Sequence, residues 1–132
     1  MCYLLDTDTV FDLINNPQGT VARQIAAVGE AAICTSIVVA AELRFGAARK
    51  ALPKLSAKVE ATLGMLDVLP LAAPADVAYG DLRARLEAAG TPIGPNDCLI
   101  AAHALVLDCT VVTGNTREFG RVDGLRVENW LR

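Results

Sequence analysis

The segment LLDTDTV, residues 4–10, joins a short apolar run to two closely spaced carboxylates. Tyr3–Leu5 predicts a buried β-strand, and Asp6 follows directly where that strand ends. Ligands of open α/β sheets bind beyond the carboxyl ends of the strands. Asp6 and Asp8 could therefore be a nucleophile and its acid/base partner, as in a phosphatase, or a metal ligand and a helix cap. For Asp8 we favour the cap.

The rest of the chain alternates apolar, strand-like runs with longer helical runs, which is typical of an α/β domain whose parallel sheet is covered on both faces. We expect strands at Tyr3–Asp6, Ala31–Thr35, Asp67–Leu71, Cys109–Thr113 and Leu125–Asn129. We expect helices at Thr20–Val28, Ile37–Lys50, Lys54–Leu66, Ala75–Ala89 and Asn96–Leu107. Ser36 can cap the second of these helices, and Gly90 can end the fourth.

Composition indicates an ordinary globular protein. The chain has 132 residues, of which 53% are hydrophobic, so we expect one domain over residues 1–132. The longest uncharged run, Ala31–Ala41, is well short of the roughly 20 residues that span a bilayer, and Asp6 lies where a signal peptide needs basic residues. We therefore expect a cytoplasmic protein with no membrane partner.

The four cysteines are scattered singly along the chain. Cys2, Cys34, Cys98 and Cys109 form no C-x-x-C motif and have no histidine pair nearby. This pattern suggests neither a zinc site nor a disulfide framework. We expect small, buried, apolar residues in a reducing compartment.

Charge is unevenly distributed. The net charge of −3 argues against a protein that holds nucleic acid by bulk electrostatics. The segment Leu43–Val59 nevertheless contains only basic charges: Arg44, Arg49, Lys50, Lys54 and Lys58. This basic patch could contact a nucleic-acid backbone, although a solvated helix face explains it as well.

Two acids lie in apolar surroundings, where an unpaired carboxylate is costly. Glu42 is in the middle of the helix SIVVAAELRFGA; it is a candidate metal ligand, or else the partner of Arg44 or Arg49 in a salt bridge. Asp97 opens the apolar helix PNDCLIAAHALVL, where the helix dipole alone could explain it. On the same helix, His103 is predicted to be a partly buried structural residue and not a general base.

A last polar cluster, VVTGNTREFG, follows the fourth strand and includes Thr113, Asn115 and Glu118. Acids from distant segments that converge at one sheet edge repel one another unless a cation lies among them. Oxygen ligands without histidine or thiolate point to Mg²⁺ or Mn²⁺. Such an ion could support cleavage of a phosphodiester.

Together these motifs resemble a known family. LLDTDTV, SIVVAAELRFG, GTPIGPNDCLIAAHAL and VVTGNTREFGRVDGLRVENW, in this order and spacing, resemble PIN-domain ribonucleases, specifically the VapC-type toxins of toxin–antitoxin modules. The resemblance implies a three-layer α/β/α domain with endoribonuclease activity that depends on Mg²⁺ or Mn²⁺. It also implies a homodimer, a VapB-type antitoxin whose tail fills the active-site groove, and a structured RNA substrate such as tRNA.

By motif, Asp6 and Asp97 match the aspartates that bind the metal directly, and Glu42 matches the helix glutamate. Many relatives have an aspartate where this chain has Asn115, so Glu118 becomes the candidate fourth acid. Glu42 and Glu118 would contact the metal directly or through water. The remaining expected roles are support of the ligands or the phosphate by Asn115, Thr113 and Asp8, and RNA binding by Arg44, Arg49, Lys50 and Lys54.

Three alternatives stay open at this point. A haloacid-dehalogenase-like phosphatase shares the D-x-D-x-[TV] motif that Asp6, Asp8 and Val10 form here, but it needs a lysine after the strand that ends at Thr113, and no lysine follows Lys58. A receiver-like signalling domain also needs a late lysine. The third alternative is a degenerate PIN domain that binds RNA without cutting it, for which Asn115 is the reason.

Overall fold

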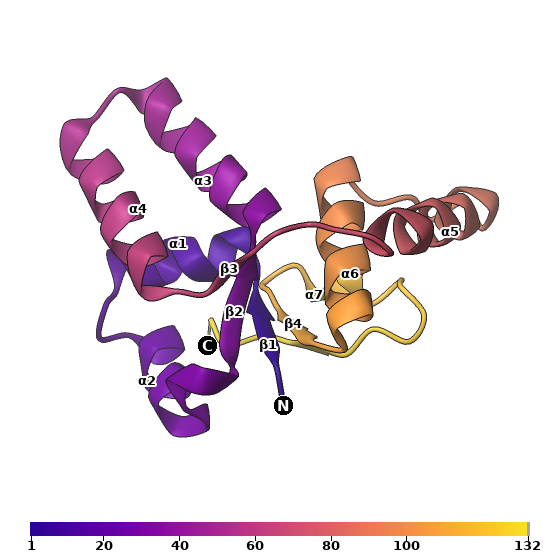
Figure 1. Ribbon diagram of the computed structural model, residues 1–132, viewed down its shortest axis with the longest axis horizontal. Coiled ribbons are helices and arrows are strands. Elements are labelled where there is room, and N and C mark those ends of the chain that lie inside the picture. The colour runs from indigo at the N-terminus through magenta and orange to yellow at the C-terminus, as the bar shows by residue number, and fades with distance from the viewer. Residues whose placement is uncertain (132) are drawn as a thin grey trace.

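A five-stranded parallel sheet lies at the centre of the computed structural model, which describes residues 1–131 (Figure 1). The strands occur in the spatial order β3-β2-β1-β4-β5. Their bounds are Tyr3–Leu5 (β1), Ile33–Ser36 (β2), Val68–Leu69 (β3), Thr110–Val112 (β4) and Val127–Glu128 (β5). The central strands β1, β2 and β4 are fully buried, as their apolar sequences predict.

Helices cover both faces of the sheet. They are α1 (Thr7–Asn15), α2 (Thr20–Val28), α3 (Ile37–Lys50), α4 (Pro53–Met65), α5 (Ala75–Ala88), α6 (Pro95–Leu107) and α7 (Thr116–Phe119), with a 3₁₀ turn at Glu30–Ala32. Connections between parallel strands are right-handed. The chain moves from β1 through β2 to β3, which places α1–α4 on one face of the sheet. It then returns to β4, which places α5 and α6 on the other face. None of these helices is long and apolar enough to cross a membrane.

The expected α/β/α architecture is confirmed, with differences at the ends of elements. β3 is shorter than the expected Asp67–Leu71, since Pro70 has no backbone N–H to continue the ladder. β5 is likewise shorter than Leu125–Asn129. Helices α1 and α7 have no counterpart among the expected ranges. Only one residue separates α1 from β1 and three separate α7 from β4, and the polar residues of the motifs hid both helices.

Ser36 and His103 join β2, α3 and α6 inside the core. The Ser36 side chain caps α3 by accepting a hydrogen bond from the Val38 backbone, as expected. Its hydroxyl oxygen also lies 2.8 Å from Nδ1 of His103, which is 2% exposed. Burial lowers the pKa of His103, while a hydrogen bond with the Pro70 backbone opposes that shift. His103 is therefore the structural residue that the sequence predicted.

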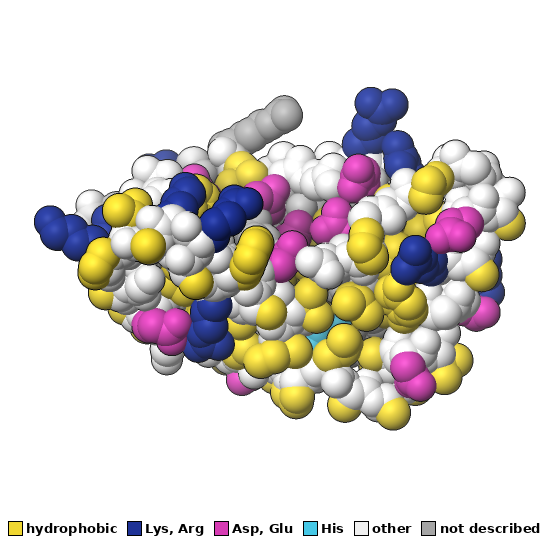
Figure 2. Space-filling view, turned by 90° about the horizontal axis from the view of Figure 1, so that it is seen from above, with side chains coloured by type: hydrophobic (Ala, Val, Ile, Leu, Met, Phe, Trp, Pro, Cys, Tyr) yellow, Lys and Arg dark blue, Asp and Glu magenta, His cyan; other side chains and the backbone are white. Residues whose placement is uncertain are grey.

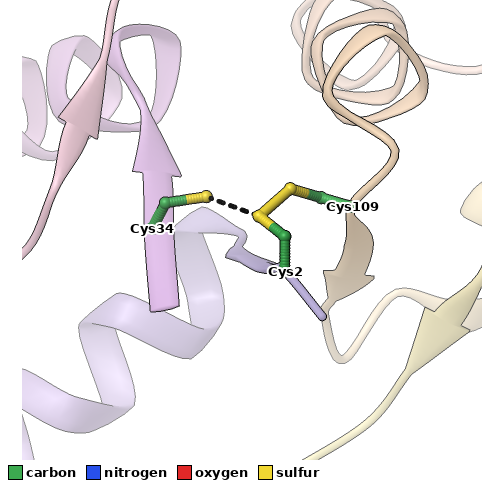
Figure 3. A group of neighbouring side chains, drawn as sticks. All are labelled: Cys2, Cys34 and Cys109. Carbon is green, nitrogen blue, oxygen red and sulfur yellow. Dashed lines mark hydrogen bonds between the residues drawn. A yellow bond between two sulfur atoms is a disulfide. The ribbon is translucent and has the colours of Figure 1, made fainter. Parts of the chain in front are cut away.

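The expectation of four unlinked cysteines is wrong. Cys2 and Cys109 form a disulfide, which lies beside Cys34 (Figure 3). Cys34 and Cys98 are buried free thiols. The parallel register aligns Tyr3 with Thr110, so the residues just before them lie opposite each other, with their Cα atoms 4.6 Å apart. A sequence separation of 107 residues concealed this proximity.

Replacement of Ser36 by alanine should lower the free energy of unfolding by about 2 to 4 kcal/mol. The change removes a helix cap, worth about 1 kcal/mol, and leaves a buried imidazole nitrogen without its partner, which costs about 1 to 3 kcal/mol more. Urea denaturation of Ser36→Ala beside Ser56→Ala measures the effect. Ser56 is a half-buried residue of α4 that makes no side-chain hydrogen bond within residues 1–131, so its loss should cost little. Equal stability losses in the two variants would contradict the assigned role of Ser36.

Candidate active site

Asp6 lies at the switch point of the sheet, where the chain leaves β1 toward β2 on one side and returns to β4 on the other. The register of β1 with β4 places Asp6 opposite Thr113. The Thr113 hydroxyl donates a 2.8 Å hydrogen bond to Oδ2 of Asp6, and the Thr7 backbone N–H donates one of 2.7 Å to Oδ1. Both carboxylate oxygens are thus fixed at the position where open α/β sheets bind ligands.

The Asp6 carboxyl is 5% exposed, and its surroundings disfavour the charge. Burial is the largest influence and raises its pKa to about 6; the hydrogen bonds from Thr7 and Thr113 oppose the rise, and the nearby charges of Asp8 and Glu42 add to it. A carboxyl held this way gains strongly from a cation beside it.

Asp8 has a different role from the expected helix cap. The residue at the N-cap of α1 is Asp6, and Asp8 lies in the first turn, exposed. Its Oδ2 accepts a 2.9 Å hydrogen bond from the backbone N–H of Gly114, and a Cβ at Gly114 would come within 2.7 Å of that oxygen. Asp8 therefore fixes the turn after β4, and a side chain in place of Gly114 would displace the Asp8 carboxylate.

Glu42 reaches the same edge from α3. Its Oε1 accepts a 2.6 Å hydrogen bond from the Thr7 hydroxyl, and its Oε2 one of 3.3 Å from the Asn96 amide. The alternative of a salt bridge from Glu42 to Arg44 or Arg49 is wrong, since Arg44 pairs with Glu60 instead. Glu42 is thus held by neutral donors from α1 and α6, which leave its charge uncompensated.

Asp97 and Glu118 complete the acidic group. Burial is the largest of the influences that together raise the pKa of Asp97 to about 7; the Asp6 charge, a hydrogen bond with the Glu118 carboxyl and the charges of Glu118 and Glu42 contribute the rest. Glu118 is oriented by Asn115, whose amide donates a 2.9 Å hydrogen bond to its Oε2. The Asn115 backbone N–H in turn donates to the Thr113 hydroxyl. The structure therefore brings together all four acids named from the sequence.

Three of these four carboxylates line a groove of about 440 Å³. Asp6, Glu42 and Asp97 line the groove, and Glu118 approaches it through Asp97. Figure 2 shows acidic side chains gathered in a hollow between two lobes of the molecule, with basic side chains on the lobe formed by α3 and α4. Among residues 1–131, none of the ion pairs involves any of the four acids.

The donor set fits a hard divalent cation. The carboxylates of Asp6, Glu42 and Asp97 line the groove, and neutral amide and hydroxyl donors hold the acids without neutralising them. Mg²⁺ and Mn²⁺ prefer oxygen ligands of this kind and retain waters for the remaining positions. The sequence did not predict that Thr7 and Asn96 orient Glu42. Its only indication was position, since each residue is next to an aspartate predicted to bind the metal.

The four basic residues expected to bind RNA are not equivalent. Arg49 and Lys50, at the end of α3, line the groove. Arg44 makes two 2.9 Å hydrogen bonds to Glu60, so its charge is already compensated. Lys54 borders a separate hollow with Leu52. The groove therefore offers the side chains of Arg49 and Lys50 beside the acids.

Comparisons with known proteins agree with this geometry. Residues 3–125 match the profile of the PIN domain. The tRNA(fMet)-specific endonuclease VapC of Shigella flexneri is 38% identical over 129 residues, which is 97% of each chain, and Ribonuclease VapC2 of Rickettsia felis is 35% identical over 132 residues, 98% of each. The crystal structure of VapBC2 from Rickettsia felis bound to a promoter DNA fragment contains a chain that matches with a TM-score of 0.91 at 34% identity, covering 98% of this chain and 99% of that one.

Without divalent cations, Asp97→Asn should raise the free energy of unfolding at pH 7.5 by about 1 to 2 kcal/mol. This figure is smaller than the full pKa shift would give, because solvent screens the charge of a partly exposed side chain. The substitution removes repulsion from Asp6, Glu118 and Glu42. Because the folded pKa values of Asp6 and Asp97 exceed the unfolded value of 3.8, the native state binds more protons between about pH 4 and pH 7. Wild-type stability should therefore fall as pH rises through that window, and the advantage of the variant should grow.

Urea denaturation in a chelator, repeated from pH 4.5 to 7.5, measures this difference. Asp123→Asn, at an exposed position outside the acidic group, is the control and should show no such pH-dependent gain. Addition of Mg²⁺ at pH 7.5 should stabilise the wild type more than Asp97→Asn. A variant advantage that is independent of pH would contradict the proposed repulsion.

Proposed function

Because this chain belongs to the PIN-domain family and its full-length relatives are VapC ribonucleases, we propose that it is the endoribonuclease toxin of a VapBC-type toxin–antitoxin system. The observation that supports this function most directly is the meeting of Asp6, Glu42, Asp97 and Glu118 at the switch point of the sheet. The phosphatase alternative has no support from the family, and Asp8 is engaged with Gly114.

We assign the binding of Mg²⁺ or Mn²⁺ to these four acids. Asp6 and Asp97 would hold the ion directly, and Glu42 and Glu118 directly or through water. When bound, the ion supplies a Lewis acid that polarises phosphate oxygens and lowers the pKa of a water molecule. Its charge would also stabilise the ionised forms of Asp6 and Asp97, whose pKa values are raised first by burial and then by the neighbouring acids.

The surrounding polar residues position the acids. Thr113 and the Thr7 backbone fix the two oxygens of Asp6, while the Thr7 hydroxyl also holds Glu42, so one residue orients two ligands. Asn115 orients Glu118 and therefore supports a carboxylate even though it is not one itself. An asparagine at position 115, where many relatives have an aspartate, is thus compatible with an active enzyme.

The substrate proposal is tRNA, with initiator tRNA as the first candidate, because a relative 38% identical to this chain is a tRNA(fMet)-specific endonuclease. Arg49 and Lys50 would contact the phosphate backbone next to the scissile bond. Phe11 lines the same groove and is 41% exposed, so it offers an aromatic face to an unpaired base. Arg44 and Lys54 are assigned weaker contributions.

The partner is a VapB-type antitoxin, as in the solved VapBC assemblies that this chain resembles. Phe45 on α3 and Leu52 between α3 and α4 are 65% and 53% exposed and lie near the groove residues Arg49 and Lys50. An antitoxin segment that covered this apolar and basic surface would block access to the acids. A homodimer remains a prediction from the family resemblance.

Asp97→Asn should reduce RNA cleavage at least about hundredfold, because it removes a direct ligand, and loss of mere supporting groups already costs about 10- to 100-fold. Expression without the antitoxin should then no longer arrest growth. The measurement is mapping of new tRNA ends in expressing cells, together with cleavage of purified tRNA in Mg²⁺. Asp123→Asn is again the matched control and should cleave normally. Full cleavage by Asp97→Asn would rule out the assignment, and RNA binding without cleavage by the wild type would favour the degenerate domain.

Lys50→Ala should weaken tRNA binding and lower the slope of log affinity against log salt by about 1, the effect of losing one phosphate contact. Binding is measured in Ca²⁺ to prevent turnover, over a series of salt concentrations. Arg85→Ala removes an exposed charge on α5, away from the groove, and is the control. If both variants behave alike, the basic patch of α3 has no specific role in RNA binding.

A further inference from the structure

Three cysteine sulfurs meet at the amino ends of β1, β2 and β4, opposite the acidic groove (Figure 3). The register aligns Leu4 with Cys34 and Tyr3 with Thr110, so Cys2 lies opposite Cys109 and diagonally across from Cys34. The Sγ atoms of Cys34 and Cys2 are 3.5 Å apart, and the three sulfurs all lie within 4.8 Å of one another. A disulfide and a third thiol therefore form one cluster.

Reduction would turn this cluster into three adjacent thiols. A dithiol reductant would supply two electrons and two protons, the bond between Cys2 and Cys109 would break, and the reductant would become a disulfide. Zn–S bonds of about 2.3 Å place the sulfurs of a tetrahedral site about 4 Å apart. The Sγ atoms of Cys2 and Cys34 are already at about that spacing, and the sulfurs of Cys2 and Cys109 would move apart to it once their bond is broken.

We propose that the reduced chain binds one thiophilic d¹⁰ metal ion, Cu⁺ or Zn²⁺, through Cys2, Cys34 and Cys109. Thiolates select these ions over hard cations. Each thiol loses its proton as its sulfur binds, so three protons leave and no group is oxidised. Cys2 is only half-buried, which leaves a side for the ion to enter and, with Zn²⁺, for a water as fourth ligand.

Burial of the third thiol favours a ligand over a reactive nucleophile. Cys34 is 4% exposed, and burial, followed by the charge of Asp67, raises its pKa to about 11. A neutral thiol attacks a disulfide poorly, so Cys34 can lie beside the bond without exchanging with it. A metal ion, in contrast, deprotonates a coordinating thiol outright.

The test uses the full chain, reduced with a phosphine and handled without oxygen, in excess Mg²⁺ to occupy the acidic groove. Cu⁺ is titrated against a chromophoric Cu⁺ chelator, and Zn²⁺ separately against a chromophoric Zn²⁺ chelator. The expected result is one bound ion per chain in at least one arm, with at least tenfold weaker binding by Cys34→Ser. The matched control is Cys98→Ser, a buried cysteine outside the cluster, which should bind like the wild type.

Circular dichroism checks that each variant folds, and Cys2→Ser replaces Cys34→Ser if the latter does not. Retention of Cu⁺, of Zn²⁺ or of both supports the proposal and identifies the ion. Failure of the reduced wild type to compete for either ion would overturn it, as would equal loss of binding in Cys98→Ser. Because the readout is binding of a soft ion, the result is independent of whether the chain cleaves RNA.

Discussion

The buried carboxylate of Asp6 is the constraint around which this fold is arranged. Asp6 is only 5% exposed, and a carboxylate buried to this extent is tolerated only if neighbouring groups stabilise it. Thr113 at the end of β4 and Thr7 at the start of α1 each donate a hydrogen bond, so the register of two strands and the start of a helix all converge on one side chain. These neutral donors orient the charge but do not cancel it.

The uncompensated charge links stability to function. Glu42, Asp97 and Glu118 add to the repulsion, and each is held by neutral hydrogen-bond donors or by another acid and not by a cation. Arg44, two residues after Glu42 on α3, is instead paired with Glu60. None of the four acids has an ion pair within residues 1–131, and this uncompensated charge is the feature on which the proposed metal binding rests.

The sequence predicted the architecture and the acids because both depend on local pattern. Apolar runs mark buried strands, and carboxylates such as Glu42 and Asp97 are conspicuous among apolar neighbours. Partners that only the register determines could not be predicted: Cys2 and Cys109 are 107 residues apart, and Arg44 finds Glu60 on the next helix. The role of Asp8 was missed for the same reason, since its partner is the Gly114 backbone.

The shortness of the central strands has a consequence for how the protein encounters metal ions. Side chains alternate along a strand, so Cys2 and Asp6 share one face of β1, about 13 Å apart at roughly 3.3 Å per residue. Cys109 and Thr113 flank β4 in the same way. Sulfur ligands at one end and oxygen ligands at the other would sort ions by chemical hardness, so that Cu⁺ or Zn²⁺ and Mg²⁺ or Mn²⁺ could be bound by one small sheet without competition.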